Sequence, residues 1–235
     1  MGRESFLRRV REAAQLGRAH RVRIHDFPPE TGYVGVDGDL CARMAKEVDA
    51  VGGKAFVVDD REQARRQLAA LLRQHDVRSA ICWSHEVLDE IELDSLLAHQ
   101  NVTSHCHKSL APLDRASQRE TMLAADIGIS SVDYAIAETG TLVVCSKPGQ
   151  ERVVTLLPPV HAAIVESAQI LPDLIDVFDR LDGRITRGLP SNISLITGPS
   201  KTGDIELQLT TGVHGPGTWY VIILRHSSAK RGEEP

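Results

Sequence analysis

The sequence predicts an α/β protein built on a largely parallel β-sheet flanked by helices, with a helical segment at the N-terminus. The main observation is an alternation of short apolar runs, rich in β-branched residues, with amphipathic helical patterns. Such alternation is typical of βαβ units. The chain has 235 residues, of which 42% are hydrophobic and 25% charged. That size and balance fit one large globular domain with a sizeable core.

The N-terminal segment is predicted to be an amphipathic helix followed by a connector. Phe6, Val10 and Ala14 recur at helical spacing within a basic stretch. A polar segment over 26–38 carries prolines and glycines that disfavour regular structure. We therefore expect three parts: a helical segment with connector over residues 1–36, the main domain over 37–226, and a polar tail over 227–235.

The first half of the main domain reads as alternating helices and strands. An apolar series at helical spacing runs from Leu40 to Val51, with Asp39 placed to cap its start and Gly52-Gly53 to end it. After it we expect a buried strand at residues 55–58 and a helix at 64–72. A second strand is expected at 79–83, followed by helical turns that extend to residue 97.

The second half adds a hairpin and further strands. After a helix near 117–125, two strand-like runs are joined by Glu138-Thr139-Gly140, which indicates a β-hairpin. Further strands are expected at residues 153–157 and 160–165, and a helix at 174–181. Two closing strands are expected at 193–196 and 220–224.

Charge and cysteine spacing exclude several classes of protein. A net charge of −5 argues against a general binder of nucleic acid or anionic membranes. The four cysteines have no Cys-x-x-Cys spacing, which argues against an iron–sulfur cluster or a zinc ribbon in this chain. Three of them lie in apolar surroundings and are expected to be buried thiols. With no signal-like segment and no apolar run that could span a membrane, we expect a cytoplasmic protein.

The segment over 197–217 is the strongest candidate for a binding loop. Its Gly198-Pro-Ser-Lys-Thr-Gly203 run is not a P-loop, because Ser200 and not glycine precedes Lys201. It is not a nucleophile elbow either, because its second glycine comes one residue late. The remaining interpretation is that Ser200, Lys201 and Thr202 hold an anion while Asp204 caps a following helical turn. An ordinary polar loop with a capping aspartate is the alternative.

Two further loops carry polar groups that allow a functional or a structural interpretation. Glu138-Thr139-Gly140-Thr141 offers one carboxylate and two hydroxyls, although Gly140 is also what a tight turn requires. His214 lies between glycines before the last strand, where it is either an acid–base group or a solvated residue. His105 and His107 would share a face if 102–107 is extended, but the sequence suggests no further metal ligands.

Four segments, taken in order, resemble the LUD-domain family, which includes the lactate utilisation protein C group. They are Ala137-Glu-Thr-Gly-Thr-Leu-Val-Val144, Leu156-Leu-Pro-Pro-Val-His161, Gly198-Pro-Ser-Lys-Thr-Gly-Asp-Ile-Glu206 and Gly212-Val-His-Gly-Pro216. The resemblance covers the chain from about Gly128 onward. Family members often have Arg at the position of Lys201 and Ala at that of Gly203, and both changes keep the local character.

The resemblance implies a fold of the NagB/RpiA/CoA-transferase group and a role in L-lactate utilisation. In that role the protein acts together with iron–sulfur partner proteins in the oxidation of lactate to pyruvate. The clusters would then belong to the partners, so no cofactor and no metal are expected in this chain.

Together, the loops predict a site for a small carboxylate or another anion. Lys201 would pair with the carboxylate, and His214 or Glu206 would carry a proton. The expected ligand-binding residues are Glu138, Thr139, Gly140, Thr141, Gly198, Ser200, Lys201, Thr202 and Asp204. Two alternatives stay open: a free-standing small-molecule enzyme of the CoA-transferase, isomerase and cyclo-ligase fold group, or a scaffold whose loops bind only protein.

Overall fold

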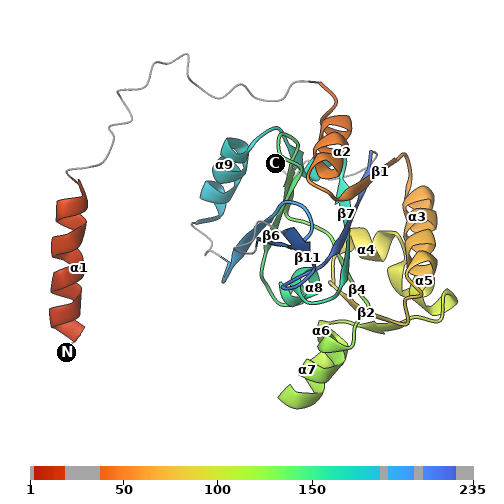
Figure 1. Ribbon diagram of the computed structural model, residues 1–235. Helices are drawn as coiled ribbons and strands as arrows, with labels where there is room; N and C mark the ends of the chain where they lie inside the picture. Colours follow the sequence, from red (N-terminus) through yellow and green to blue (C-terminus); the bar gives the residue numbers. More distant parts are fainter. Residues whose placement is uncertain (1–2, 19–37, 186–189, 204–208, 226–235) are drawn as a thin grey trace, which may run out of the picture. The chain divides into compact units, whose positions relative to one another are not determined.

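The computed structural model describes residues 3–18, 38–185, 190–203 and 209–225 (Figure 1). The chain divides into two units, Met1–Val34 and Gly35–Pro235. The described part of the first unit is one helix, α1 (Arg3–Arg18), which confirms the predicted N-terminal helix. An Arg8–Glu12 ion pair one turn apart joins two of its exposed side chains.

The second unit is built on a six-stranded sheet in which every neighbouring pair of strands is parallel. This confirms the predicted parallel sheet. The strand order is β1-β12-β7-β4-β2-β3, and the strands are β1 (Lys54–Val58), β12 (Thr218–Leu224), β7 (Val160–Glu166), β4 (Ile127–Ser130), β2 (Ser79–Cys82) and β3 (Thr103–His105).

Helices cover this sheet. In Figure 1, α3 and α5 lie on one side of the sheet, while α9 and a second, smaller sheet lie on the other. The helices are α2 (Leu40–Ala50), α3 (Arg61–Gln74), α4 (Glu86–Glu90), α5 (Leu93–His99), α6 (His107–Leu110), α7 (Arg115–Leu123), α8 (Val153–Leu156) and α9 (Leu174–Ile185), with a 3₁₀ turn at Ser167–Gln169. No helix in the described ranges is long and apolar enough to span a membrane.

Helix α2 begins and ends as the sequence predicts. The Asp39 carboxylate accepts the amide of Ala42 at 3.1 Å, which satisfies one free donor of the first turn. Gly52 has φ +93°, a left-handed conformation that favours glycine at the end of a helix. The chain then turns directly into β1.

The core runs through the middle of the parallel sheet. All seven residues of β7 are buried, as are six of the seven in β12. Strands buried on both faces are expected where helices cover a parallel sheet on both sides. Each fully buried Val, Leu or Ile contributes roughly 1.5–3 kcal/mol relative to an exposed one. The apolar runs seen in the sequence therefore supply most of the stability of this unit.

A second sheet of four strands, in the order β8-β5-β6-β9, contains the predicted hairpin. Strands β5 (Tyr134–Ile136) and β6 (Thr141–Cys145) pair antiparallel, as expected from the Glu138–Gly140 turn. They are flanked by β8 (Ile170–Leu171) and β9 (Ile193–Ile196). A small cluster that includes Ile136, Val143 and Val177 packs beneath this sheet.

The segment after β9 is more regular than the predicted loop. Lys201–Gly203 forms a strand, β10, that pairs antiparallel with β11 (Leu209–Thr211). Asp204, and with it the expected helix cap, lies outside the described residues. Lys201 and Thr202 therefore belong to a two-stranded ribbon.

The strand predicted at 153–157 is wrong, because Val153–Leu156 forms helix α8. The β-branched residues there favour a strand locally, but the helix packs closely on β4. A Cβ atom added at Gly128 of β4 would come within 1.8 Å of the Val154 carbonyl oxygen. Only glycine permits so close a backbone approach, so the packing of α8 depends on a residue 26 positions away.

The order of the strands has a consequence for function. From β2 the chain moves to β3 on one side and then to β4, β7 and β12 on the other. The winding direction therefore reverses between β2 and β4. In open α/β sheets, ligands bind outside the carboxyl ends of the strands at such a reversal.

Candidate functional site

The predicted loops lie at the amino edge of the parallel sheet. The segment over 197–217 leads into Thr218, the first residue of β12, and Thr218 pairs with Val160, the first residue of β7. The C-terminal end of α2 leads into β1 at the same edge, where Lys54 pairs with Tyr220. The loops that the sequence favours are thus at the edge opposite to the usual ligand position.

Three threonine hydroxyls tie the hairpin turn to β9. Thr139 Oγ1 and Thr141 Oγ1 are 2.6 Å apart, and Thr141 Oγ1 lies 2.7 Å from Thr197 Oγ1. Thr141 is buried, whereas Thr139 and Thr197 are exposed. The chain of hydroxyls therefore runs from the interior to the surface, and each buried hydroxyl is satisfied.

The same loops pack against the end of α2. A Cβ atom at Gly140 would lie 2.6 Å from the amide nitrogen of Val48, and one at Gly198 would lie 2.8 Å from the carbonyl oxygen of Val51. The Lys201 ammonium donates to that Val51 carbonyl at 2.7 Å. A cation at a helix C-terminus is stabilising, so these contacts give Gly140, Gly198 and Lys201 a structural role.

The loop that carries His214 joins this group through its backbone. The Ser200 amide donates to the Pro216 carbonyl at 2.8 Å, and the Gly212 amide donates to the Ser200 carbonyl at 2.9 Å. His214 itself is exposed and makes no side-chain hydrogen bond within the described residues. The Glu138 amide donates to the Pro172 carbonyl.

The structure thus brings some of the predicted site residues together and leaves others apart. Gly140, Gly198 and Lys201 contact the end of α2, and the three threonine hydroxyls belong to the same loops. Ser200 is joined to the His214 loop through its backbone. Among the described residues, no side-chain hydrogen bond or ion pair joins Glu138 or His214 to this group. Thr202 pairs with Thr210 in the ribbon. Asp204 and Glu206 lie outside the described residues.

The carboxyl edge carries a second set of polar groups that the sequence did not reveal. The segment between β6 and α8 lies across the end of β2. The Ser84 amide donates to the Gly149 carbonyl at 2.8 Å, and the Trp83 indole donates to the Glu151 carbonyl at 3.0 Å. Strand β2 is the strand at which the winding direction reverses, so this segment covers the usual ligand position.

Asp133, which closely follows β4, fixes the start of that segment. Its carboxylate accepts the Cys145 amide at 2.8 Å and the Lys147 ammonium at 3.3 Å, and only 3% of its side chain is exposed. Lys147 lines a cavity of about 330 Å³ together with His85 and Glu166. Burial lowers the pKa of His85, and the Lys147 charge lowers it further.

A histidine–carboxylate pair lies at the same edge. His107 Nδ1 and Glu151 Oε1 are 2.5 Å apart, and both side chains are partly exposed. Glu151 Oε1 also accepts the Gly149 amide at 3.0 Å. His107 begins α6 and does not extend β3, so it does not share a strand face with His105.

A different histidine is buried inside the sheet. His161 Nε2 lies 2.9 Å from Ser130 Oγ, and both residues are fully buried. Burial lowers the pKa of His161 to about 3, which keeps the ring neutral. This pair joins β4 to β7, and neither residue lines the cavity of about 330 Å³ at the carboxyl edge.

The signal that identifies the carboxyl-edge residues is their position just after parallel strands. Ser84 and His85 follow β2, Asp133 follows β4, and His107 follows β3. To infer from this signal that these residues lie near one another, the order of the strands in the sheet must be known, and local sequence does not give that order. Among the described residues, no group of three or more His, Cys, Asp and Glu side chains is arranged to hold a metal ion.

Fold and site define the class as a doubly wound α/β protein with polar groups at the strand reversal. Its fold is similar to that in the crystal structure of a DUF162 family protein from Deinococcus radiodurans, with a TM-score of 0.56. That match covers 79% of this chain and 96% of that one at 19% identity, so it shows a shared fold.

The model of the LUD domain matches residues 41–224, and the chain belongs to the LUD-domain family. It is 33% identical over 230 residues to lactate utilization protein C of Halalkalibacterium halodurans, covering 91% of this chain and 94% of that protein. It is 30% identical over 217 residues to lactate utilization protein C of an Exiguobacterium species, covering 91% and 92%. The resemblance seen in the sequence motifs is confirmed.

Proposed function

We propose that the chain is a component of an L-lactate utilisation system, which oxidises lactate to pyruvate. In this proposal the chain acts together with iron–sulfur partner proteins. The observation that supports this proposal is similarity along nearly the whole length to proteins named lactate utilization protein C. The chain itself has no Cys-x-x-Cys spacing, and three of its four cysteines are buried. In this proposal the clusters and the electron transfer belong to the partners.

In this proposal the amino-edge loops bind a small carboxylate. Lys201 pairs with it, and His214 or Glu206 carries a proton. Exposure supports this placement, because Thr139, Lys201 and His214 all reach the surface. Lys201 already donates to Val51, so an arriving carboxylate would share the ammonium group with that carbonyl. The other proposed contacts are Glu138, Gly140, Thr141, Gly198, Ser200, Thr202 and Asp204.

The test is affinity purification of the full chain from cells grown on L-lactate. We expect iron-containing proteins to co-purify, with iron and acid-labile sulfide in the eluate in amounts comparable to the chain. A parallel purification of the untagged chain controls for non-specific adsorption. Elution of the chain alone, free of iron and sulfide, would contradict the proposal.

A second candidate is a free-standing enzyme of the CoA-transferase, isomerase and cyclo-ligase fold group acting on an anionic substrate. The strand reversal with cavities at the carboxyl edge favours it. A ligand at a hundred times its Kd stabilises the folded state by about 2.7 kcal/mol. Thermal stabilisation by a CoA ester, a sugar phosphate or ATP, without any partner association, would favour this candidate over the first.

A further inference from the structure

Hydrogen bonds to the Glu151 carboxylate and to its backbone carbonyl fix the position of the His107–Glu151 pair. Glu151 Oε1 faces His107 Nδ1 at 2.5 Å and accepts the Gly149 amide at 3.0 Å, while the Trp83 indole holds the Glu151 carbonyl at 3.0 Å. A carboxylate at Nδ1 places the ring proton there. His107 Nε2 is then the acceptor that remains for a ligand hydroxyl.

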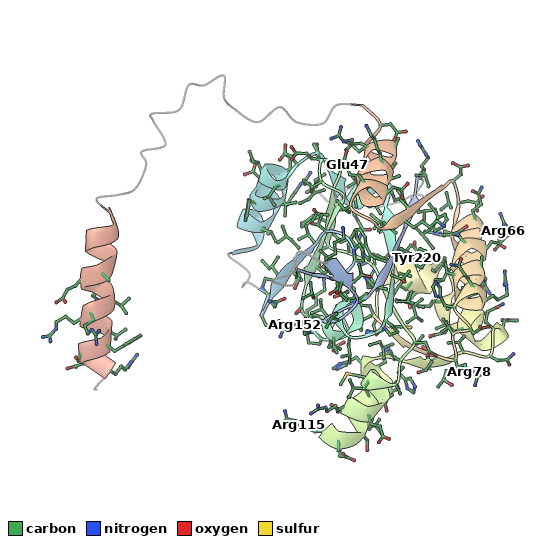
Figure 2. The ribbon with its side chains drawn as sticks, in the orientation of Figure 1. Glu47, Arg66, Arg78, Arg115, Arg152 and Tyr220 are labelled. Atoms are coloured by element: carbon green, nitrogen blue, oxygen red, sulfur yellow. The ribbon has the colours of Figure 1, made fainter. Side chains whose placement is uncertain are left out.

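Cationic and polar side chains surround one side of this pair. A cavity of about 750 Å³ is lined by His107, Glu151, Ser146, Lys147, Pro148, Arg152, Ser191 and Asn192. Lys147 is already paired with Asp133. Arg152 is exposed, extends near the start of α8 (Figure 2) and forms no ion pair within the described residues. A guanidinium without a carboxylate partner is suited to bind a carboxylate in two-point fashion.

The other side of the pair is mostly apolar. A cavity of about 410 Å³ is lined by the apolar side chains of Ile81, Leu110, Ala111, Met122, Val153 and Val154, by Cys82, His105, Cys106 and Gln118, and by the shared residues His107, Glu151 and Arg152. Its size falls within the range of small-molecule sites, which combine apolar walls with a few placed polar groups. The pair and Arg152 thus line both a polar and an apolar cavity.

We propose that these two adjoining cavities bind a small carboxylate that carries a hydroxyl group and an apolar chain of several carbons. Arg152 binds the carboxylate, His107 Nε2 accepts the hydroxyl proton in a hydrogen bond, and the chain enters the apolar cavity. Glu151 acts as a positioning residue for His107. Lactate, whose apolar part is one methyl group, would leave most of the apolar cavity empty. The proposal therefore goes beyond the role in lactate utilisation and does not depend on it.

Calorimetric titration of the full chain with L-lactate, 2-hydroxyhexanoate and hexanoate tests the proposal. Each added methylene should tighten binding by about fourfold, because its burial contributes ~0.8 kcal/mol and 1.4 kcal/mol is a factor of ten. 2-Hydroxyhexanoate should therefore bind far more tightly than lactate. It should also bind more tightly than hexanoate, which lacks the hydroxyl. Equal affinities for lactate and 2-hydroxyhexanoate, or no binding of either, would overturn the proposal.

Matched variants separate the carboxylate contact from general charge. Arg152→Gln should weaken binding of 2-hydroxyhexanoate at least tenfold. Arg119→Gln, an exposed change on α7 outside both cavities, should leave it unchanged. An equal loss in both variants would overturn the assignment of Arg152.

A second pair of variants tests the apolar cavity. Ala111→Phe should fill it and abolish the preference for the longer acid. Ala116→Phe, which is also exposed and lines neither cavity, should retain that preference. Preference for the longer acid in Ala111→Phe would contradict the proposed position of the chain.

The positioning role of Glu151 has its own readout. Glu151→Gln keeps an oxygen for His107 Nδ1 and should keep the preference for the hydroxy acid over hexanoate. Glu151→Leu should lose that preference while still binding hexanoate through Arg152. Ligand binding is measured on the purified chain alone. A failure to bind the hydroxy acid therefore does not contradict the proposed role in lactate utilisation, and a failure to co-purify iron-containing proteins does not contradict the proposed ligand site.

Discussion

The Lys201 ammonium donates a 2.7 Å hydrogen bond to the carbonyl oxygen of Val51, which caps the C-terminal end of α2. The two residues are 150 positions apart in the chain. The contact joins the ribbon of β10 and β11 to the helix that leads into β1. A lysine that the sequence suggests only as an anion-binding group therefore also stabilises the fold.

Replacing Lys201 with methionine should lower the free energy of unfolding by about 0.5–1 kcal/mol, because a cation at a helix end and its hydrogen bond are both lost. Urea denaturation measures the change. Lys46→Met, an exposed change on α2 itself, is the control and should alter stability by less than about 0.5 kcal/mol. Equal stability of wild type and Lys201→Met would show that the contact contributes nothing.

Gly140→Ala should destabilise the protein more than Gly38→Ala. Both glycines have positive φ, so both substitutions strain the backbone. Only at Gly140 would the new Cβ meet backbone, 2.6 Å from the Val48 nitrogen; around Gly38 nothing lies within 4 Å. We expect a loss of about 1 kcal/mol at Gly38 and of about 3 kcal/mol at Gly140 in chemical denaturation. Similar losses at the two positions would argue against the tight packing of the hairpin on α2.

Stability should fall as the pH falls below about 6.5, in part because of His161. Its folded pKa of about 3 lies below the unfolded value of 6.5, so between these values only the unfolded chain binds the proton. The difference costs about 2 kcal/mol of stability between about pH 7 and pH 5. His161→Gln keeps a hydrogen-bonding partner for Ser130 and does not titrate. The pH dependence of its urea midpoint should therefore be weaker, and an unchanged dependence would contradict this assignment.

The four cysteines should differ in reactivity. Cys41, Cys82 and Cys145 are buried, while Cys106 is partly exposed. Burial raises the pKa of the Cys82 thiol to about 12, so almost no thiolate is present there near neutral pH. We expect iodoacetamide to modify Cys106 first in the native protein and the other three only after unfolding, as read by peptide mass spectrometry. Rapid native labelling of Cys82 would contradict the described packing of β2.

Much of the fold could be predicted because its signals are local. The cap at Asp39, the glycine at 52 and the spacing of Leu40, Met44 and Val48 determine α2 within a few residues. The hairpin turn at Gly140 is equally local. Helix α8 could not be predicted, because the β-branched residues of Val153–Leu156 favour a strand by themselves, and the close packing of the helix over Gly128 has no local signal.

The candidate sites were harder to predict, because they depend on strand order. The segment over 197–217 is rich in glycine and polar residues and directly follows β9, which makes it resemble a ligand loop. Its position at the amino edge follows only from the pairing of Thr218 with Val160. His107 and Glu151 are 44 positions apart and belong to no motif, so their 2.5 Å contact has no sequence signal.

Growth on L-lactate as sole carbon source tests the central claim most directly. A strain that lacks this gene should fail to grow on lactate and should grow normally on a sugar. The wild-type gene supplied in trans should restore growth on lactate. Undiminished growth of the deletion strain on lactate, in a background without a second copy, would contradict a role in lactate utilisation.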